Sequence, residues 1–229
     1  MSKLDKIMEK VSTGEMQYRD LVLSVREEEN ETPDHIVEGY ASTYNEPYYL
    51  YRVKAPDGYT IEVREEVDRH AFDETNMDDV IMQYNHEGRV FARISNGTLK
   101  LNKDDPKGLF ISADLGGTEI GRQLYEEIKG GYTNKMSFGF TIDQASELRE
   151  IESDNDADET WVYTIEKIGR LYDVSAVSLP QNDFTSISAR AYGNGVISAR
   201  VTERLHQHEE KVERMKRIEE LTKLIESED

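Results

Sequence analysis

Short segments with the period-two pattern of half-buried strands recur along most of the chain, and residues that favour turns separate them. The stretch from Met16 to Val25 has this pattern, residues 36–44 repeat it, and Asn96-Gly97 forms a strong hairpin signal between two further segments. The whole pattern predicts about nine or ten short strands. We therefore expect a mainly β protein, built as a barrel or a sandwich.

Helical spacing is found in three places. Residues 3–13 have a short amphipathic pattern, and residues 118–129 have a stronger one that begins at Thr118 and ends before Gly130-Gly131. After Gly193-Asn194-Gly195, which has the composition of a linker, apolar residues recur every three or four positions to the C-terminus. We expect a helical extension over residues 1–15, a β-rich domain over residues 16–190, and a linker with an amphipathic helix over residues 191–229.

The composition argues against several classes of function. Lys and Arg number 28 against 47 Asp and Glu, a net charge of −19, which repels nucleic-acid phosphates and anionic membrane surfaces. The chain has no cysteine, so neither disulfides nor thiolate–metal sites are expected. The N-terminus lacks the apolar run of a signal peptide, and no later segment approaches a membrane span. These features predict a soluble cytosolic protein that needs no metal or other cofactor.

One serine lies in a setting that a nucleophile could use. Ser137 lies in Met136-Ser137-Phe138-Gly139-Phe140, where alternation sends both phenylalanines to one face of a strand and Ser137 to the other. A serine needs a general base within hydrogen-bond reach and a third group that orients the base. Without such partners, Ser137 is an ordinary strand residue.

His86 is the candidate base, because it follows the apolar run Val80-Ile81-Met82-Gln83-Tyr84 and is held by that strand. A histidine that only satisfies a nearby carbonyl is the alternative. The other four histidines have weaker settings. His35 and His70 have no recognisable partners, and His206 and His208 lie among glutamates, where we expect them to be solvated.

Asp173 is the candidate for the third group. It lies within an apolar strand segment, residues 171–180, where an unpaired carboxylate would be costly. It should therefore have a partner. That partner is either a histidine or a salt bridge to Arg170 or Lys135.

The order of these segments resembles the prohead (capsid maturation) protease family of tailed bacteriophages. The segments are QYNHEGRVFAR, then NGTLKLNKDDPKGLFISADL, a helix, GYTNKMSFGF and LYDVSAVSLPQND. The resemblance extends over residues 16–190, which it identifies as a protease domain. One departure is His70, which stands where a glycine is usual in the family.

The resemblance implies both a fold and a set of site residues. The family is similar to the herpesvirus assembly proteases, so a closed β-barrel flanked by helices is expected. Ser137 then matches the nucleophile, His86 the general base and Asp173 the acid that orients His86. For the third position, Glu87, Glu166 and Asp183 remain alternatives.

The resemblance also implies a biological setting. The chain would cleave scaffolding protein, or a scaffold-like segment of the major capsid protein, inside the procapsid in the host bacterial cytoplasm. It would also cleave itself, with residues 190–200 as a suitable place. The C-terminal helix would bind scaffold or capsid, pack on its own domain, or associate with a second copy as a homodimer. The competing hypotheses are a non-catalytic scaffold or capsid-lining protein on the same barrel, and a small β-barrel binding module with no viral role.

Overall fold

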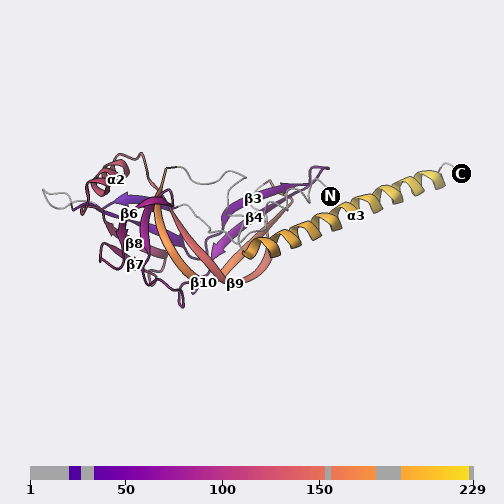
Figure 1. The fold of residues 1–229 in the computed structure, drawn as a ribbon. Coiled ribbons are helices and arrows are strands. Elements are labelled where there is room, and N and C mark those ends of the chain that lie inside the picture. Colours follow the sequence, from indigo (N-terminus) through magenta and orange to yellow (C-terminus); the bar gives the residue numbers. More distant parts are fainter. Residues whose placement is uncertain (1–20, 27–33, 153–155, 179–191, 227–229) are drawn as a thin grey trace.

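The computed structural model describes residues 21–26, 34–152, 156–178 and 192–226, which form a strand-rich body and one long projecting helix (Figure 1). The helix expected over residues 3–13 lies outside the described residues. The elements, in chain order, are β1 (Leu21–Val25), β2 (Ile36–Thr43), β3 (Tyr48–Lys54), β4 (Thr60–Val67), β5 (Ile81–Tyr84), β6 (Glu87–Arg93), β7 (Leu99–Asn102), β8 (Gly108–Asp114), α2 (Glu119–Lys129), β9 (Lys135–Ile151), β10 (Glu159–Val177) and α3 (Tyr192–Glu226).

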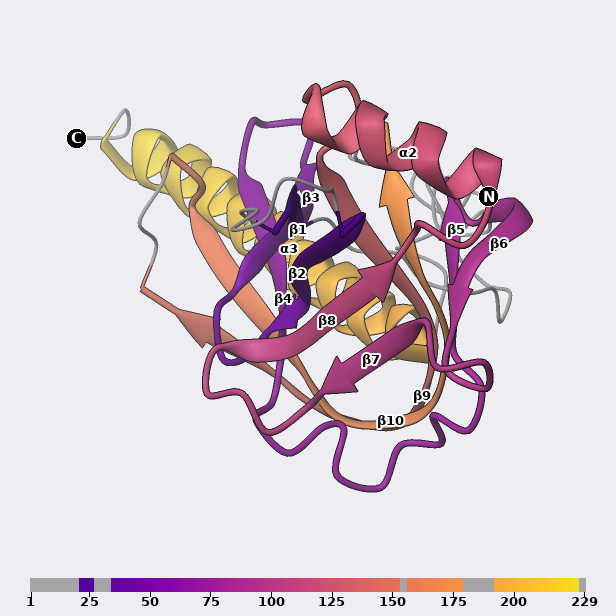
Figure 2. The ribbon, with the colours of Figure 1, turned by 90° about the vertical axis from the view of Figure 1, so that its left-hand side faces the viewer.

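Two long strands, β9 and β10, form a curved antiparallel hairpin (Figures 1 and 2). The hairpin joins β3 and β4 to the strands β1, β2, β8 and β7. The sheet order is β3-β4-β10-β9-β1-β2-β8-β7, and β5 pairs with β10 and with β6. Parallel to β10 run β4, along its first part, and β5, along its second part. The sheet therefore forks at this edge of β10.

The expected mainly β fold with helices is confirmed, but the expected closed barrel is wrong. Starting from β6, the sheet can be followed through β5 to β10 and then along β9, β1, β2 and β8 to β7. Among the described strands, no ladder joins the two end strands, β6 and β7. Closure of the sheet would require the outer edges of β6 and β7 to pair with one another. The first half of β6 is also exposed, and its ladder with β5 becomes irregular after Met82. An open sheet results.

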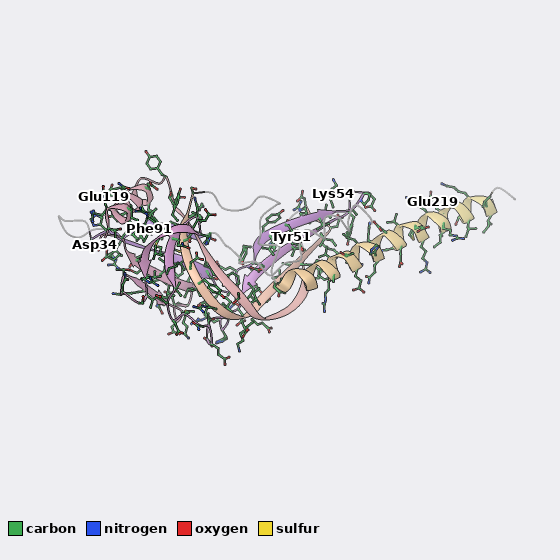
Figure 3. All side chains as sticks on the ribbon, in the orientation of Figure 1. Asp34, Tyr51, Lys54, Phe91, Glu119 and Glu219 are labelled. Carbon is green, nitrogen blue, oxygen red and sulfur yellow. The ribbon has the colours of Figure 1, made fainter. Side chains whose placement is uncertain are left out.

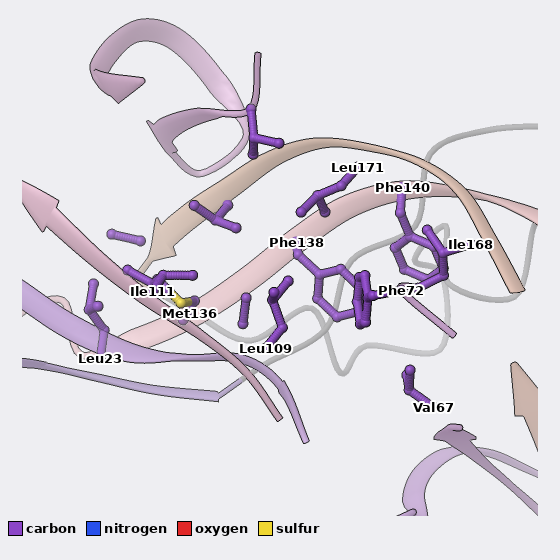
Figure 4. Packing of buried hydrophobic residues seen from close by; sticks show 14 of the residues in the cluster. Leu23, Val67, Phe72, Leu109, Ile111, Met136, Phe138, Phe140, Ile168 and Leu171 are labelled. Carbon is purple, nitrogen blue, oxygen red and sulfur yellow. The ribbon is translucent and has the colours of Figure 1, made fainter. Parts of the chain in front are cut away.

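The core lies on the face of β9 that bears Phe138 and Phe140 (Figure 4). Their rings stack with centroids 4.6 Å apart, and Phe72 packs against Phe138 at 6.3 Å. Full burial of a side chain of this size contributes about 1.5–3 kcal/mol. The predicted alternation along β9 is confirmed, because both phenylalanines point into the core from the same face.

Strands also include much of the stretch 143–160, which is rich in Asp and Glu. β9 continues to Ile151 and β10 begins at Glu159, so only the tip of the hairpin lies outside both strands. Backbone pairing along a long hairpin does not require an apolar face, so a stretch rich in Asp and Glu can still form paired strands. β10 continues through Gly169, and its pairing with β9 is irregular between Ile165 and Arg170.

The first part of α3 packs against the strands. Val201 and Leu205 are only 2% exposed, and Arg204 forms an ion pair with the buried carboxylate of Glu159. Gly193-Asn194-Gly195, expected as a linker, is helical because α3 begins at Tyr192.

His208 is a second correction, because it is not solvated as expected. Its ring stacks on Tyr59 with centroids 3.8 Å apart, and its Nε2 lies 2.7 Å from Asp57 Oδ2. This hydrogen bond lowers the pKa of Asp57. The turn between β3 and β4 therefore holds one face of α3. His206 is exposed, as expected.

The distal part of α3 extends beyond β3 and β4 (Figures 1 and 3). Its exposed apolar side chains recur at helical spacing, as expected for a helix that lacks a partner surface. They are Met215, Ile218, Leu221, Leu224 and Ile225.

Candidate active site

Three strands bring polar side chains onto the sheet face opposite the phenylalanine core. In the ladder between β9 and β10, Ser137 is directly opposite Ser175, and Gly139 is opposite Asp173. On the other side of β10, Gln83 of β5 aligns with Ser175. Residues directly opposite one another share a face, with Cβ atoms about 4.5–5.5 Å apart. Ser137, Ser175 and Asp173 thus form one polar cluster whose spacing is fixed by the backbone ladder.

His86 reaches this cluster from the two-residue turn between β5 and β6. Asn85 and His86 have φ values of 50° and 59°, the left-handed pair that a tight hairpin turn requires. Asn tolerates this conformation, but at the second position glycine is preferred, and a histidine there costs on the order of 1 kcal/mol. The chain thus places an imidazole where glycine would be the less strained residue.

Asn85 fastens the turn to the end of β10. Its backbone N–H donates to the carbonyl oxygen of Ala176 at 2.9 Å, and its side-chain oxygen accepts from the N–H of Ser178 at 3.1 Å. Its amide nitrogen also donates to Ser178 Oγ at 3.3 Å. These bonds hold the residue next to His86 against the strand that carries Asp173.

His86 and Asp173 form a buried hydrogen bond. His86 Nδ1 lies 2.6 Å from Asp173 Oδ1, and the side chains are 8% and 3% exposed. An ionised carboxylate only accepts hydrogen bonds, so Nδ1 carries the proton that is donated to Asp173. A proton transfer by a general base would then take place at the other ring nitrogen, Nε2. Of the partners expected for Asp173, the structure provides the histidine, while the Arg170 guanidinium lies over the Tyr172 ring instead.

Ser137 lies one strand away from this pair and is only 1% exposed. In the described part of the chain its Oγ makes no hydrogen bond, so the expected contact with His86 is not formed in this conformation. Catalytic hydrogen bonds are often long or absent before substrate binds. What the structure provides is a buried histidine–carboxylate pair and a buried serine on the same sheet face.

The comparison with protein families decides the class of this chain. A family model described as Caudovirus prohead serine protease matches residues 22–196. The chain belongs to this family. The match runs from β1 into the start of α3 and includes Ser137, His86 and Asp173. Neither the curated proteins nor the solved structures contain a match to the chain.

Two of the other acids considered for the third position are exposed side chains. Glu87 begins β6 and is exposed, and Glu166 is an exposed residue of β10. Asp183 lies outside the described residues. His70, which replaces a usual glycine, is exposed and has its Nδ1 3.0 Å from Asp73 Oδ2. Of the acids considered that the structure describes, Asp173 is hydrogen-bonded to His86.

Sequence reasoning missed two residues near the site, Asn85 and Ser175. Ser175 is fully buried and donates a hydrogen bond to Asp173 Oδ1 at 2.6 Å. The period of two places residues i and i+2 on one strand face, so Ser175 was detectable as a neighbour of Asp173. Asn85 was detectable from the preference of two-residue hairpin turns for asparagine.

Two further findings concern the described residues only. They contain no group of three or more His, Asp or Glu side chains arranged to hold a metal ion. Neither α2 nor α3 has an apolar stretch that could cross a bilayer.

Proposed function

We propose that this chain is a serine endopeptidase of phage capsid maturation, with Ser137 as nucleophile, His86 as general base and Asp173 as the orienting acid. The observation that carries the proposal is the buried hydrogen bond of 2.6 Å between His86 and Asp173, on the sheet face that Ser137 shares. The match to the prohead serine protease family supports the reaction class.

The proposed reaction is acyl transfer. Ser137 Oγ attacks the carbonyl carbon of the scissile peptide bond while its proton passes to His86 Nε2. Asp173 holds the ring by Nδ1 and stabilises the positive charge that develops on it. The imidazolium then donates its proton to the leaving amine, and the acyl-enzyme is hydrolysed by water that His86 activates. Backbone N–H groups would stabilise the oxyanion.

Access to the nucleophile is an added requirement of this mechanism. Because Ser137 is 1% exposed, a peptide can reach its Oγ only after a neighbouring part of the protein moves. The described conformation is therefore a closed one. In this state, peptide hydrolysis would be slower than in an opened enzyme.

The proposed substrates are scaffolding protein or a scaffold-like segment of the major capsid protein, inside the procapsid, and the chain itself. Proteases bind their substrates in extended form, because the attacked carbonyl must be free of helical hydrogen bonding. Residues 192–200 are helical in α3. A cleavage site within that part of the expected region would therefore require the helix to unwind first.

We also propose that the distal part of α3 pairs with a second copy of the chain. Residues 211–226 contain five Lys or Arg and four Glu, so their net charge is 5 − 4 = +1, against −19 for the whole chain. Two copies would therefore repel one another only weakly at this segment, while Ile218 and Leu221 offer exposed apolar surface.

Sedimentation velocity tests this pairing. It should show a wild-type dimer that dissociates in the double variant Ile218→Glu/Leu221→Glu. Lys216→Ala, on the opposite side of the helix, should leave the dimer intact. A monomeric wild type would refute the pairing.

The proteolytic function is tested by comparing wild type with Ser137→Ala. Each is expressed alone and with the cognate capsid and scaffolding proteins, and intact masses are measured. We expect truncated products that disappear in Ser137→Ala. Ser42→Ala removes another buried strand serine, whose Oγ donates only to a backbone carbonyl, and should cleave like wild type.

The same experiment separates the competing hypotheses. Identical masses for wild type and Ser137→Ala under every condition, together with co-sedimentation of the chain with capsid protein, would favour a non-catalytic assembly protein. Identical masses without capsid binding would favour a binding module with no part in assembly.

A further inference from the structure

Asp173 has a second buried partner besides His86. Ser175 Oγ donates to Asp173 Oδ1 at 2.6 Å, the same distance as the bond from His86 Nδ1 to that oxygen. Ser175 is 0% exposed and Asp173 is 2% exposed, so water has little access to this carboxylate. Both donors therefore converge on one oxygen in a dry environment, where charge-assisted hydrogen bonds are strong.

The two donors differ in how they are anchored. His86 lies in a turn, whereas Ser175 lies within β10 and is paired on both sides, with Ser137 of β9 and Gln83 of β5. The Ser175 hydroxyl is thus fixed by the most constrained part of the sheet. If His86 were its single hydrogen-bond donor, the Asp173 carboxylate could rotate whenever the His86 ring moves. A second donor from the sheet fixes the carboxylate independently of the turn.

Ser175 is also the nearest rival to Ser137 as a nucleophile, because the two are directly opposite in the ladder. Its hydrogen-bond partner argues against that role. The Ser175 proton is donated to Asp173, whereas the Ser137 hydroxyl has no hydrogen bond among the described residues. The two serines therefore have different tasks within one cluster.

We infer that Ser175 is a positioning residue, which holds the Asp173 carboxylate in the orientation that aligns His86 with Ser137. This inference rests on the proposed proteolytic function. In this role Ser175 acts on the reaction through Asp173 and His86, so its loss should lower kcat and leave KM unchanged. Loss of one hydrogen bond to a buried charged group should cost about 10- to 100-fold in kcat.

Three substitutions separate orientation from packing. Ser175→Ala removes the hydroxyl, Ser175→Cys fills nearly the same space with a weak donor, and Ser175→Thr keeps the hydroxyl. The assays are kcat and KM for cleavage of the cognate substrate. A second readout is the proton NMR signal of the His86 Nδ1–H, which lies far downfield when it is held by a buried carboxylate.

We expect kcat to fall about 10- to 100-fold in Ser175→Ala and Ser175→Cys with KM within about twofold, and Ser175→Thr to recover most of the rate. The downfield signal should shift or broaden in the Ala and Cys variants and remain in Thr. Wild-type kcat in Ser175→Ala would overturn the inference. Full recovery by Cys, or a loss confined to KM, would do the same.

The controls distinguish failure of this inference from failure of the proposed function. Cleavage that Ser137→Ala abolishes and Ser175→Ala leaves intact would refute the role of Ser175 alone. If wild type and Ser137→Ala both leave every substrate intact, the proteolytic function fails. In that case the NMR signal of the His86 Nδ1–H tests whether Ser175 positions Asp173. An unchanged signal in Ser175→Ala refutes the positioning role, and a lost signal supports it.

Discussion

Replacing Asp173 with asparagine should lower kcat strongly while leaving the fold intact. Asparagine has nearly the same shape, so the buried space is filled and an amide oxygen can still accept from Ser175 Oγ. The negative charge beside His86 is lost. If the amide nitrogen turns toward His86 Nδ1 instead, the ring must place its proton on Nε2, and it can no longer accept the Ser137 proton.

The size of the loss follows from the geometry. The bonded atoms of His86 and Asp173 are 2.6 Å apart, which places the centres of positive and negative charge about 4 Å apart once His86 is protonated. At an effective dielectric constant of about 20, that pair is stabilised by about 4 kcal/mol, or about 10³-fold in rate. The wrong tautomer can increase the loss to about 10⁴-fold, as in serine proteases of other folds.

The assay is single-turnover cleavage of the cognate capsid or scaffolding substrate, with circular dichroism and thermal unfolding to verify the fold. Glu166→Gln is the matched control, because it removes an exposed carboxylate from the same strand that was also considered for the third position. A folded Asp173→Asn variant with cleavage within about tenfold of wild type would refute the assigned role. Loss of activity in Glu166→Gln alone would transfer the role to that residue.

Other predictions concern the docking of α3 and the turn of the base. Leu205→Ala should lower the free energy of unfolding by about 2–4 kcal/mol in urea titration, because the side chain is 2% exposed. Burial raises the pKa of Glu159, but hydrogen bonds from neighbouring side chains outweigh it and hold the pKa below its usual value. The stability from Glu159 is therefore present above the ordinary glutamate pKa, about 4.3, and is lost as pH falls through the lowered value. Fluorescence of Trp161, the only tryptophan and a hydrogen-bond donor to Glu159, should report this transition below about pH 4. Asn85→Ala should reduce kcat about tenfold by loosening the turn of His86, and it should also lower the unfolding midpoint, because alanine loses the bonds to Ser178 and is strained at this φ.

Local patterns predicted the strands but not the closure of the sheet. Period-two alternation reports which residues share a strand face, and it placed Phe138 and Phe140 correctly on one face of β9, which is the face that lies in the core. Closure depends on which distant edges pair. The chain uses one edge of β10 for both β4 and β5, and nothing in the local sequence of Tyr163 or Val174 indicates which neighbour each will have. The barrel was therefore expected from the family resemblance and was not formed.

The same limit applies to the site. Alternation predicted the strand face of Ser137, and the apolar run before His86 predicted that a rigid strand delivers it. Which acid meets His86 depends on the register between β10 and β5, and that register becomes visible only in three dimensions. His208 shows the opposite error. Its glutamate-rich surroundings indicated solvent, whereas the turn at Asp57 and Tyr59, about 150 residues away, covers it.

The division of the site between sheet and turn bears on how it becomes active. Ser137 and Asp173 are carried by adjacent central strands, so their separation cannot change without breaking the ladder between β9 and β10. His86 lies in a two-residue turn with strained backbone angles, and the pairing of β6 with β5 is irregular between Glu87 and Ala92. In the proposed mechanism, the His86 ring would therefore move toward Ser137 Oγ to accept its proton, while the sheet keeps Ser137 and Asp173 in place. Ser175 holds Asp173 from within the sheet, so the carboxylate keeps its position and the His86 ring can keep its hydrogen bond to it.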